Sequence, residues 1–279
     1  MTLELRARAA IARLELAYNP LQPRGKDGRW IKGGAGAPSA PSAPAKKAAR
    51  KAAPARQAGV RGWLDEAKSG KLSTATKNRV SKMLTFTDPQ TGMRTEVASV
   101  EPVAGGRVQA SIKVYDKDGS WVGQALRTIE PPKKPGGKDR IYHNSFQLAP
   151  RARNGGFSSR WLREMEDRYR EQGIGEIALT TQDVGGYAWA KAGFDFSDRD
   201  EAKVAASSLS RKLKMKSWRN QLTQRQITDG EELIRRAKTG GEDFPTPAEF
   251  AMLGWMPGLE TWIGKEAMLG TGWHGVKEL

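Results

Sequence analysis

Residues 148–158, Leu148-Ala-Pro-Arg-Ala-Arg-Asn-Gly-Gly-Phe-Ser158, connect a β-prone segment to an amphipathic one. Apolar residues then recur at the spacing of one helical face: Phe157, Trp161, Leu162, Met165 and Tyr169. Gly155 and Gly156 permit a sharp turn and a close approach of the backbone to a ligand. The unpaired N–H groups and partial positive charge of a helix N-terminus favour an anion. The stretch therefore predicts a phosphate site, and a plain loop-to-helix turn is the alternative.

Residues 140–148, just before this turn, predict a strand. Alternation places two sets of side chains on opposite faces, Ile141, His143, Ser145 and Gln147 on one and Tyr142, Phe146 and Leu148 on the other. After the helix, residues 174–180 predict a second strand. Gly185-Gly186 then opens a short helix over 187–192, which Gly193 closes.

The part of the chain before residue 140 has the alternation of a β-meander. Its strands are predicted over 97–103, 108–114 and 121–129. Asp118-Gly119 is a hairpin turn, because Gly accepts positive φ. Short helices are predicted over 63–68 and 74–84, the second capped by Ser73. The whole pattern predicts an α/β fold with a mixed central sheet and flanking helices.

The order strand, Pro, basic-x-x-Gly turn, helix, strand and Gly-Phe resembles the GNAT superfamily of acetyltransferases. Arg153–Ser158 line up with the family's acetyl-CoA loop, Arg/Gln-x-x-Gly-x-Gly/Ala, and Pro150 falls at its Pro position. Trp189–Phe194 is similar to its Tyr-x-x-x-Gly-Phe segment. The resemblance covers residues 63–200 and implies N-acyl transfer with acetyl-CoA as co-substrate. The cofactor-binding residues that it implies are Arg151, Arg153, Asn154, Gly155, Gly156, Phe157 and Ser158.

The acid–base residues of that family are not matched. Trp189 stands where the family often has a Tyr that acts as general acid, and a Trp cannot donate and recover a proton as a phenol does. The strand at 141–149 has no carboxylate to act as a base. The candidate catalytic residues are therefore His143, as a base, and Tyr187, while a hydrogen-bonded strand His is the alternative for His143. Retained catalysis and a binding domain without catalysis both stay open.

The chain of 279 residues has a net charge of +16, and residues 1–62 hold 13 basic and 3 acidic side chains. Residues 1–18 predict an amphipathic helix, and residues 19–62 are too polar and Pro/Ala-rich to fold, which predicts a disordered basic arm. Six cations in it have no acid among them: Lys46, Lys47, Arg50, Lys51, Arg56 and Arg61. This arm predicts binding of DNA or another polyanion, and a solvated linker is the alternative.

Residues 201–279 predict a helical, Trp- and Gly-rich C-terminal extension that packs on the protein or on a neighbouring subunit. Thr246-Pro-Ala-Glu249 is a capping box for one of its helices. The chain has no Cys and two His, so neither a disulfide nor a metal site is expected. Since no apolar run reaches the length of a bilayer and no signal peptide is seen, we expect no membrane span and a cytoplasmic location.

Three segments also resemble head-associated proteins of actinobacterial phages: Asn19–Trp30, Gly185–Phe196 and Trp273–Lys277. This second resemblance implies a phage-encoded protein, with phage structural proteins as partners and a place in the virion. The leading function is thus acyl-CoA binding and N-acetyl transfer to an unknown acceptor. The alternative is a non-catalytic virion protein whose basic arm contacts DNA or the capsid.

Overall fold

The computed structural model describes residues 59–182, 184–241, 243–256 and 259–279. The predicted helix at 1–18, the arm up to residue 58 with Lys46 to Arg56, and the phage-like Asn19–Trp30 segment lie outside these described residues. Among the helices that are described, none combines the length and the apolar character needed to span a bilayer.

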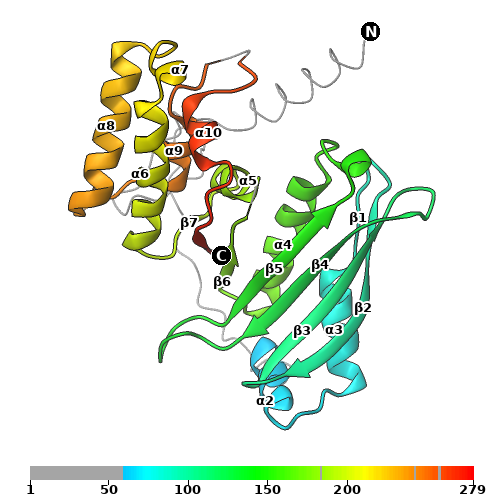
Figure 1. The fold of residues 1–279 in the computed structure, drawn as a ribbon. Helices are drawn as coiled ribbons and strands as arrows, with labels where there is room; N and C mark the ends of the chain where they lie inside the picture. Colours follow the sequence, from blue (N-terminus) through cyan, green and yellow to red (C-terminus); the bar gives the residue numbers. More distant parts are fainter. Residues whose placement is uncertain (1–58, 183, 242, 257–258) are drawn as a thin grey trace, which may run out of the picture.

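The first half of the sheet is an antiparallel meander preceded by two helices (Figure 1). The elements are α2 (Val60–Lys68), α3 (Thr74–Leu84), β1 (Phe86–Thr87), β2 (Arg94–Val103), β3 (Arg107–Tyr115) and β4 (Trp121–Glu130). The Ser73 hydroxyl accepts a hydrogen bond from the N–H of Thr76 at 3.2 Å, so the predicted cap is confirmed. Gly119 has φ 83° between β3 and β4, as the predicted hairpin turn requires.

The strand β5 (Arg140–Leu148) makes the sheet mixed, because it pairs antiparallel with β4 and parallel with β6 (Glu176–Thr180). The short helix η1 (Pro150–Ala152) and the helix α4 (Phe157–Gln172) connect these two strands. The strand order is β1-β2-β3-β4-β5-β6-β8-β7. The predicted α/β class, a mixed central sheet with flanking helices, is confirmed.

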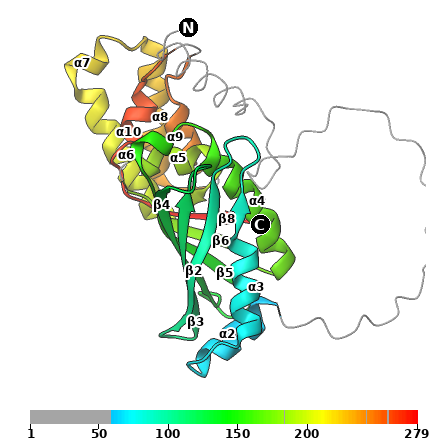
Figure 2. The ribbon, with the colours of Figure 1, turned by 90° about the vertical axis from the view of Figure 1, so that its right-hand side faces the viewer.

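The helices α2, α3 and α4 cover one face of the sheet (Figure 2). Alternate residues of β3 point to that face and are fully buried: Val108, Ala110, Ile112 and Val114. The predicted apolar face of α4 is buried along its whole length, and its first aromatic ring, Phe157, lies 6.0 Å from the ring of Phe86. The hydrophobic core therefore lies between this helical layer and the sheet.

A group of helices, of which α6 and α8 are the longest, lies between β7 (Asp195–Phe196) and β8 (His274–Glu278) in the sequence. After α5 (Gly185–Lys191) come α6 (Arg199–Lys214), α7 (Lys216–Arg219), α8 (Gln224–Thr239), α9 (Pro247–Met252) and α10 (Ile263–Met268). The capping box at Thr246 and Glu249 is confirmed at the start of α9. Figure 1 shows these helices as a cluster beside the end of the sheet where β6 and β7 lie.

The last residues of the chain form a strand, whereas the sequence predicted helices and irregular structure there. β8 pairs antiparallel with β6 on one side and with β7 on the other. The side chains of Trp262 and Trp273 are buried, as expected for a tail that packs on the protein. Long-range pairing with β6 and β7 fixes residues 274–278, and local sequence carries little signal of it.

The folded part also begins earlier than the predicted end of the arm at residue 62. Arg61 lies in α2, and its Nε donates to the carboxylate of Asp139 at 3.1 Å. It therefore differs from the unopposed cations with which the sequence grouped it.

Candidate functional site

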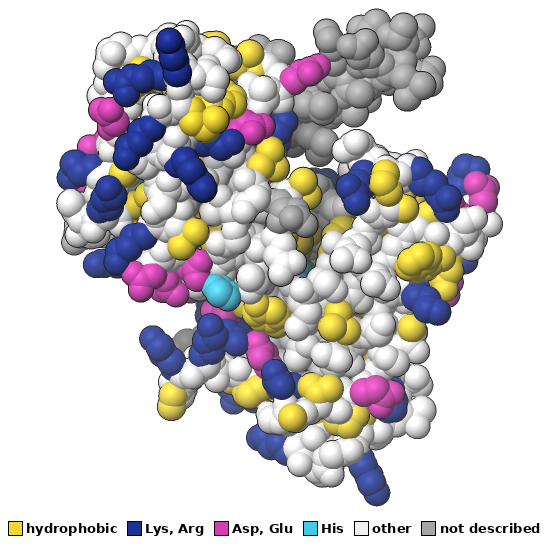
Figure 3. All heavy atoms as spheres, in the orientation of Figure 1, with side chains coloured by type: hydrophobic (Ala, Val, Ile, Leu, Met, Phe, Trp, Pro, Cys, Tyr) yellow, Lys and Arg dark blue, Asp and Glu magenta, His cyan; other side chains and the backbone are white. Residues whose placement is uncertain are grey.

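β5 and β6 are neighbours over only part of their length. Their parallel pairing runs from Arg140 and Glu176 to His143 and Leu179. Beyond this point β5 continues to Leu148 and pairs with β4 alone among the described residues. Figure 1 shows the two strands separating, and Figure 3 shows the surface hollowed between the sheet and the C-terminal helices. A free strand edge therefore borders an opening at the centre of the sheet.

A β-bulge lies where the two strands separate. On β4, Leu126 pairs with Ser145 and the next residue, Arg127, pairs with His143. Asn144 is thus the extra residue of β5, and an extra residue shifts the alternation of the strand by one.

The bulge corrects the predicted faces of β5. The imidazole of His143 lies 5.9 Å from the ring of Tyr169, and the ring of Phe146 lies 5.2 Å from that of Trp161. Both partners are on the buried face of α4. His143 and Phe146, which uninterrupted alternation placed on opposite faces, therefore point the same way.

The loop after β5 delivers the chain into α4 with an open N-terminus. Gly156 is the N-cap residue with φ 74°, and no side chain caps this end of the helix. Asn154 also has a positive φ, 67°. Arg151 and Arg153 are exposed, and Nε of Arg153 donates to the carbonyl of Leu148 at 2.9 Å. The N–H groups of the first turn are thus available to an anion, with two cations beside them.

Arg160, in the first turns of α4, fixes the shape of this loop. Its Nε and Nη2 donate to the two carboxylate oxygens of buried Asp88, both at 2.7 Å, and Nη2 also donates to the carbonyl of Gly155 at 2.6 Å. These bonds to Arg160 are the main cause that lowers the pKa of Asp88 to about 2. A Cβ on Gly156 would lie 2.5 Å from Nη1 of Arg160, so a side chain has no room there.

A buried polar cluster lies between β4, β5 and α4. The guanidinium of Arg127 donates to the carbonyl of Ser145 at 2.7 Å and lies 5.1 Å from the ring of Trp161. The hydroxyl of Tyr169 is buried close to Arg127; burial raises the pKa of Tyr169 to about 12, and the charge of Arg127 opposes that rise. Among the described residues Arg127 has no ion pair, and burial lowers its pKa. The cluster is therefore positive and lacks a compensating carboxylate.

The contacts of the His143 imidazole are few. Its Nε2 lies 3.3 Å from the hydroxyl of Tyr169, and which of the two atoms donates depends on the tautomer of His143. Its Nδ1 is buried without a partner among the described residues. Burial and the charge of Arg127 lower the pKa of His143 well below its usual range. His143 is therefore a neutral imidazole that carries a single N–H.

The two aromatic residues of α5 have different neighbours. The ring of Trp189 lies 6.1 Å from His143 and 5.2 Å from Phe194. The ring of Tyr187 lies 5.7 Å from that of Trp262, on the side of the C-terminal helices. The structure therefore brings Trp189 to His143, and the catalytic roles of His143 and Tyr187 stay predictions.

Arg127 and the pair of Asp88 and Arg160 are not among the site residues predicted from the sequence. A signal existed for Arg127, because the alternation of β4 places it on the same face as Ala125 and Ile129, which are buried. No local pattern connects Asp88 with Arg160, since they are 72 positions apart. Among the described residues no cluster of three metal-ligating side chains occurs.

No protein-family model matches the sequence, and no curated protein matches it. Solved structures that resemble it include Arabidopsis thaliana Naa50 in complex with a CoA bisubstrate analogue, with 27% identity, a TM-score of 0.27, and coverage of 32% of this chain and 58% of that chain. A GNAT family acetyltransferase from Elizabethkingia anophelis with acetyl-CoA bound gives 13% identity, a TM-score of 0.26, and coverage of 32% and 56%.

A third similar structure is N-acetylglutamate synthase from Neisseria gonorrhoeae complexed with coenzyme A and N-acetyl-glutamate. It is 16% identical with a TM-score of 0.29, and the match covers 61% of this chain and 25% of that one. The matched part spans a little over half the length of the first two structures. Because every one of these TM-scores is low, the function is inferred from the residues of this chain.

Proposed function

We propose that this chain binds an acyl-CoA and transfers the acyl group to an amine. The observation that carries the proposal is the separation of β5 from β6 directly beside the open N-terminus of α4. A CoA has a pyrophosphate at one end and an extended chain with two amides at the other. The N-terminus of α4 can bind the pyrophosphate, and the free edge of β5 can form hydrogen bonds with the two amides.

In this proposal the pyrophosphate accepts hydrogen bonds from the first-turn N–H groups of α4, and Arg151 and Arg153 add positive charge. The bonds from Arg160 to Asp88 and to the carbonyl of Gly155 keep the loop in the binding shape before the ligand arrives. The edge of β5 over residues 144–148 offers backbone donors and acceptors to the pantetheine amides, as a strand edge does to a peptide.

The transfer itself needs few side chains. The amine nitrogen attacks the thioester carbonyl, the C–N bond forms, the C–S bond breaks, and the amine proton ends on the sulfur of CoA. We place the ring hydrogen of neutral His143 on Nδ1, which has no partner among the described residues, and assign this N–H to stabilisation of the developing oxyanion rather than to general base catalysis. Trp189, beside His143, shields the reaction from water but supplies no proton.

Ser158, exposed in the first turn of α4, allows a test that separates binding from folding. Ser158→Glu places a carboxylate where the phosphate would bind, which should weaken acetyl-CoA binding at least about tenfold, or ~1.4 kcal/mol. The same carboxylate stabilises the helix by roughly 0.3–1 kcal/mol. Ser158→Gln is the matched neutral control. Equal affinities of the two variants in calorimetric titration would refute the loop assignment.

A second candidate is acyl-CoA binding without turnover, favoured by Trp189 and by the absence of an acid on β5. A thiol reagent can distinguish the two, because the chain has no Cys of its own to react. Release of CoA thiol above the rate of spontaneous hydrolysis, in the presence of an amine, indicates transfer. Binding without release indicates the second candidate.

The phage-like segments support a further proposal, that the protein is a phage head-associated protein whose arm contacts DNA or the capsid. Detection of this chain in purified virions by mass spectrometry is the direct test. Its absence from virions that contain every other head protein would exclude this role.

A further inference from the structure

A second basic region lies on the C-terminal helices, far in sequence from the arm. From Glu201 to Asp229 the chain has no acidic residue between the two, but it has seven basic ones: Lys203, Arg211, Lys212, Lys214, Lys216, Arg219 and Arg225. This run covers α6, α7 and the start of α8. Figure 3 shows Lys and Arg side chains gathered over this part of the surface.

These cations fall into two groups. Three of them form ion pairs, Lys203 with Asp200, Lys212 with Glu266 and Arg225 with Asp229. The other four are exposed and form no ion pair within the part of the chain that the structure describes: Arg211, Lys214, Lys216 and Arg219. We call these four the α6–α7 patch. Like charges that gather without acids on a rigid surface attract anions.

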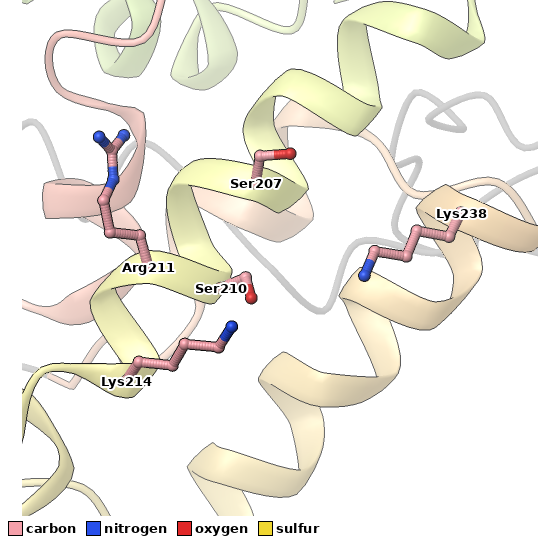
Figure 4. Close-up of a pocket in the computed structure, with 5 residues that line it drawn as sticks. All are labelled: Ser207, Ser210, Arg211, Lys214 and Lys238. Carbon is pink, nitrogen blue, oxygen red and sulfur yellow. The ribbon is translucent and has the colours of Figure 1, made fainter.

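A groove of about 370 Å³ between α6 and α8 continues the patch. Its lining has hydroxyl and cationic groups and no carboxylate: Ser207, Ser210, Arg211, Lys214 and Lys238. Figure 4 shows Ser210 and Lys214 from α6, and Lys238 from α8, pointing into the space between the helices. Hydroxyls and ammonium groups together are the donors that proteins use to hold phosphate oxygens.

We propose that the α6–α7 patch and its groove bind the sugar–phosphate backbone of a nucleic acid, independently of the acyl-CoA site. Attraction to helix dipoles explains part of the charge, since Arg211 and Lys214 lie in the last turn of α6. It explains less at Lys216 and Arg219, because α7 is a single turn of four residues and has only a small dipole. A polyanion accounts for all four.

The same helices do not suit a lipid surface. A helix that binds a membrane inserts an apolar face below its cations. Most apolar residues of α6 are buried against the protein: Ala202, Ala205, Ala206, Leu209 and Leu213. Ile227, Leu233 and Ala237 of α8 are buried as well. Val204, near the start of α6, and Met215, just after its end, are half exposed but too far apart to form one apolar face. The patch therefore has charge without a continuous apolar face to insert.

The test compares two triple variants of the full chain with the same change in net charge. The patch variant is Lys214→Gln, Lys216→Gln and Arg219→Gln. The control replaces three exposed cations of α6 and α8 that have acidic partners, Lys203→Gln, Arg225→Gln and Arg235→Gln. Binding of a fluorescent DNA duplex is measured by anisotropy between about 50 and 200 mM salt. Both variants keep residues 1–58, so binding by the arm is common to both.

We expect the negative slope of log K against log salt concentration to be shallower by about 2.7 in the patch variant than in wild type, because each phosphate contact contributes roughly 0.9 to its magnitude. The control should keep the wild-type slope, and both should keep the wild-type thermal midpoint. The single variant Lys216→Gln, with an expected loss of about 0.9, repeats the test with less disturbance. Equal slopes in the two triple variants would overturn the proposal. So would binding to phosphatidylserine vesicles that is tighter than binding to DNA.

Discussion

The carboxylate of Asp88, fully buried after β1, accepts two hydrogen bonds of 2.7 Å from Arg160 on α4. The two residues connect the start of the sheet to the loop that precedes α4, because Arg160 also holds the carbonyl of Gly155. The shape of the loop thus depends on Asp88, which belongs to the meander and fixes the position of Arg160.

Asp88→Asn should lower the free energy of unfolding by roughly 3 kcal/mol at neutral pH, because it leaves a half-buried guanidinium without its charge partner. The pKa of Asp88 is about 2 in the folded protein, below its usual value. The stability that the carboxylate contributes is therefore present above about pH 4 and is lost as the pH falls towards 2. Urea unfolding should show the difference between wild type and variant narrowing over that interval. If the difference in unfolding free energy between wild type and variant stays constant over this pH interval, the lowered pKa does not belong to Asp88.

Gly156→Ala should destabilise the protein by about 2 kcal/mol, because a Cβ strains the backbone at φ 74° and approaches Arg160. Gly155→Ala serves as the control, since its Cβ would approach Thr91 at an ordinary distance of 3.4 Å. Chemical unfolding of both variants measures the effect. Two equal losses would mean that the turn at Gly156 is not the sensitive point.

Tyr169→Phe should change the tautomer of His143. In the proposed arrangement the phenol of Tyr169 donates to Nε2 of His143 and the ring hydrogen is on Nδ1, so removal of the phenol hydrogen frees the ring hydrogen to move to Nε2. Nitrogen-15 NMR reports the position of that hydrogen directly. His274→Gln leaves a single imidazole signal and removes ambiguity, because the chain has two His. A wild-type spectrum with hydrogen on Nε2 would contradict the proposed donor chain.

Burial of His143 should make the protein less stable in mild acid. Its pKa is lowered well below the usual value in the folded state, so below about pH 6.5 the unfolded chain binds a proton that the folded chain does not. Stability should then decrease by up to about 1.4 kcal/mol for each pH unit below 6.5. His143→Phe should remove this slope between about pH 5 and 6.5. If stability depends on pH in the same way in the His143→Phe variant, groups other than His143 cause the slope.

Removal of residues 273–279 should abolish cooperative unfolding, because β8 lies between β6 and β7 and Trp273 is buried. Circular dichroism during heating checks this. The substitution Lys277→Gln is the milder companion, since it breaks the 2.6 Å contact to Glu166 on α4 and keeps the strand. If the shortened chain unfolds with a wild-type midpoint, β8 contributes no stability.

Local chemistry made much of this fold predictable from the sequence. The cap at Ser73, the turn at Gly119 and the capping box at Thr246 depend on a few neighbouring residues, and each is present. The apolar face of α4 and the Gly turn before it follow in the same way.

The remaining features depend on residues that are distant in sequence. The bulge at Asn144 is set by pairing with β4, and no periodicity within β5 marks it. The strand His274–Glu278 contains a Gly and three polar residues, so propensity does not select it. The surroundings of His143 come from two other elements, because Arg127 lies on β4 and Tyr169 on α4.

The position of β8 in the sheet also determines the order in which the strands can pair during synthesis of the chain. Within the described part of the chain β7 pairs with β8 alone, and roughly eighty residues separate the two strands along the chain. On the ribosome, the meander can assemble as soon as it emerges, but β7 must wait for the helices α6 to α10 to be made. The edge of β6 stays open to wrong partners during that interval.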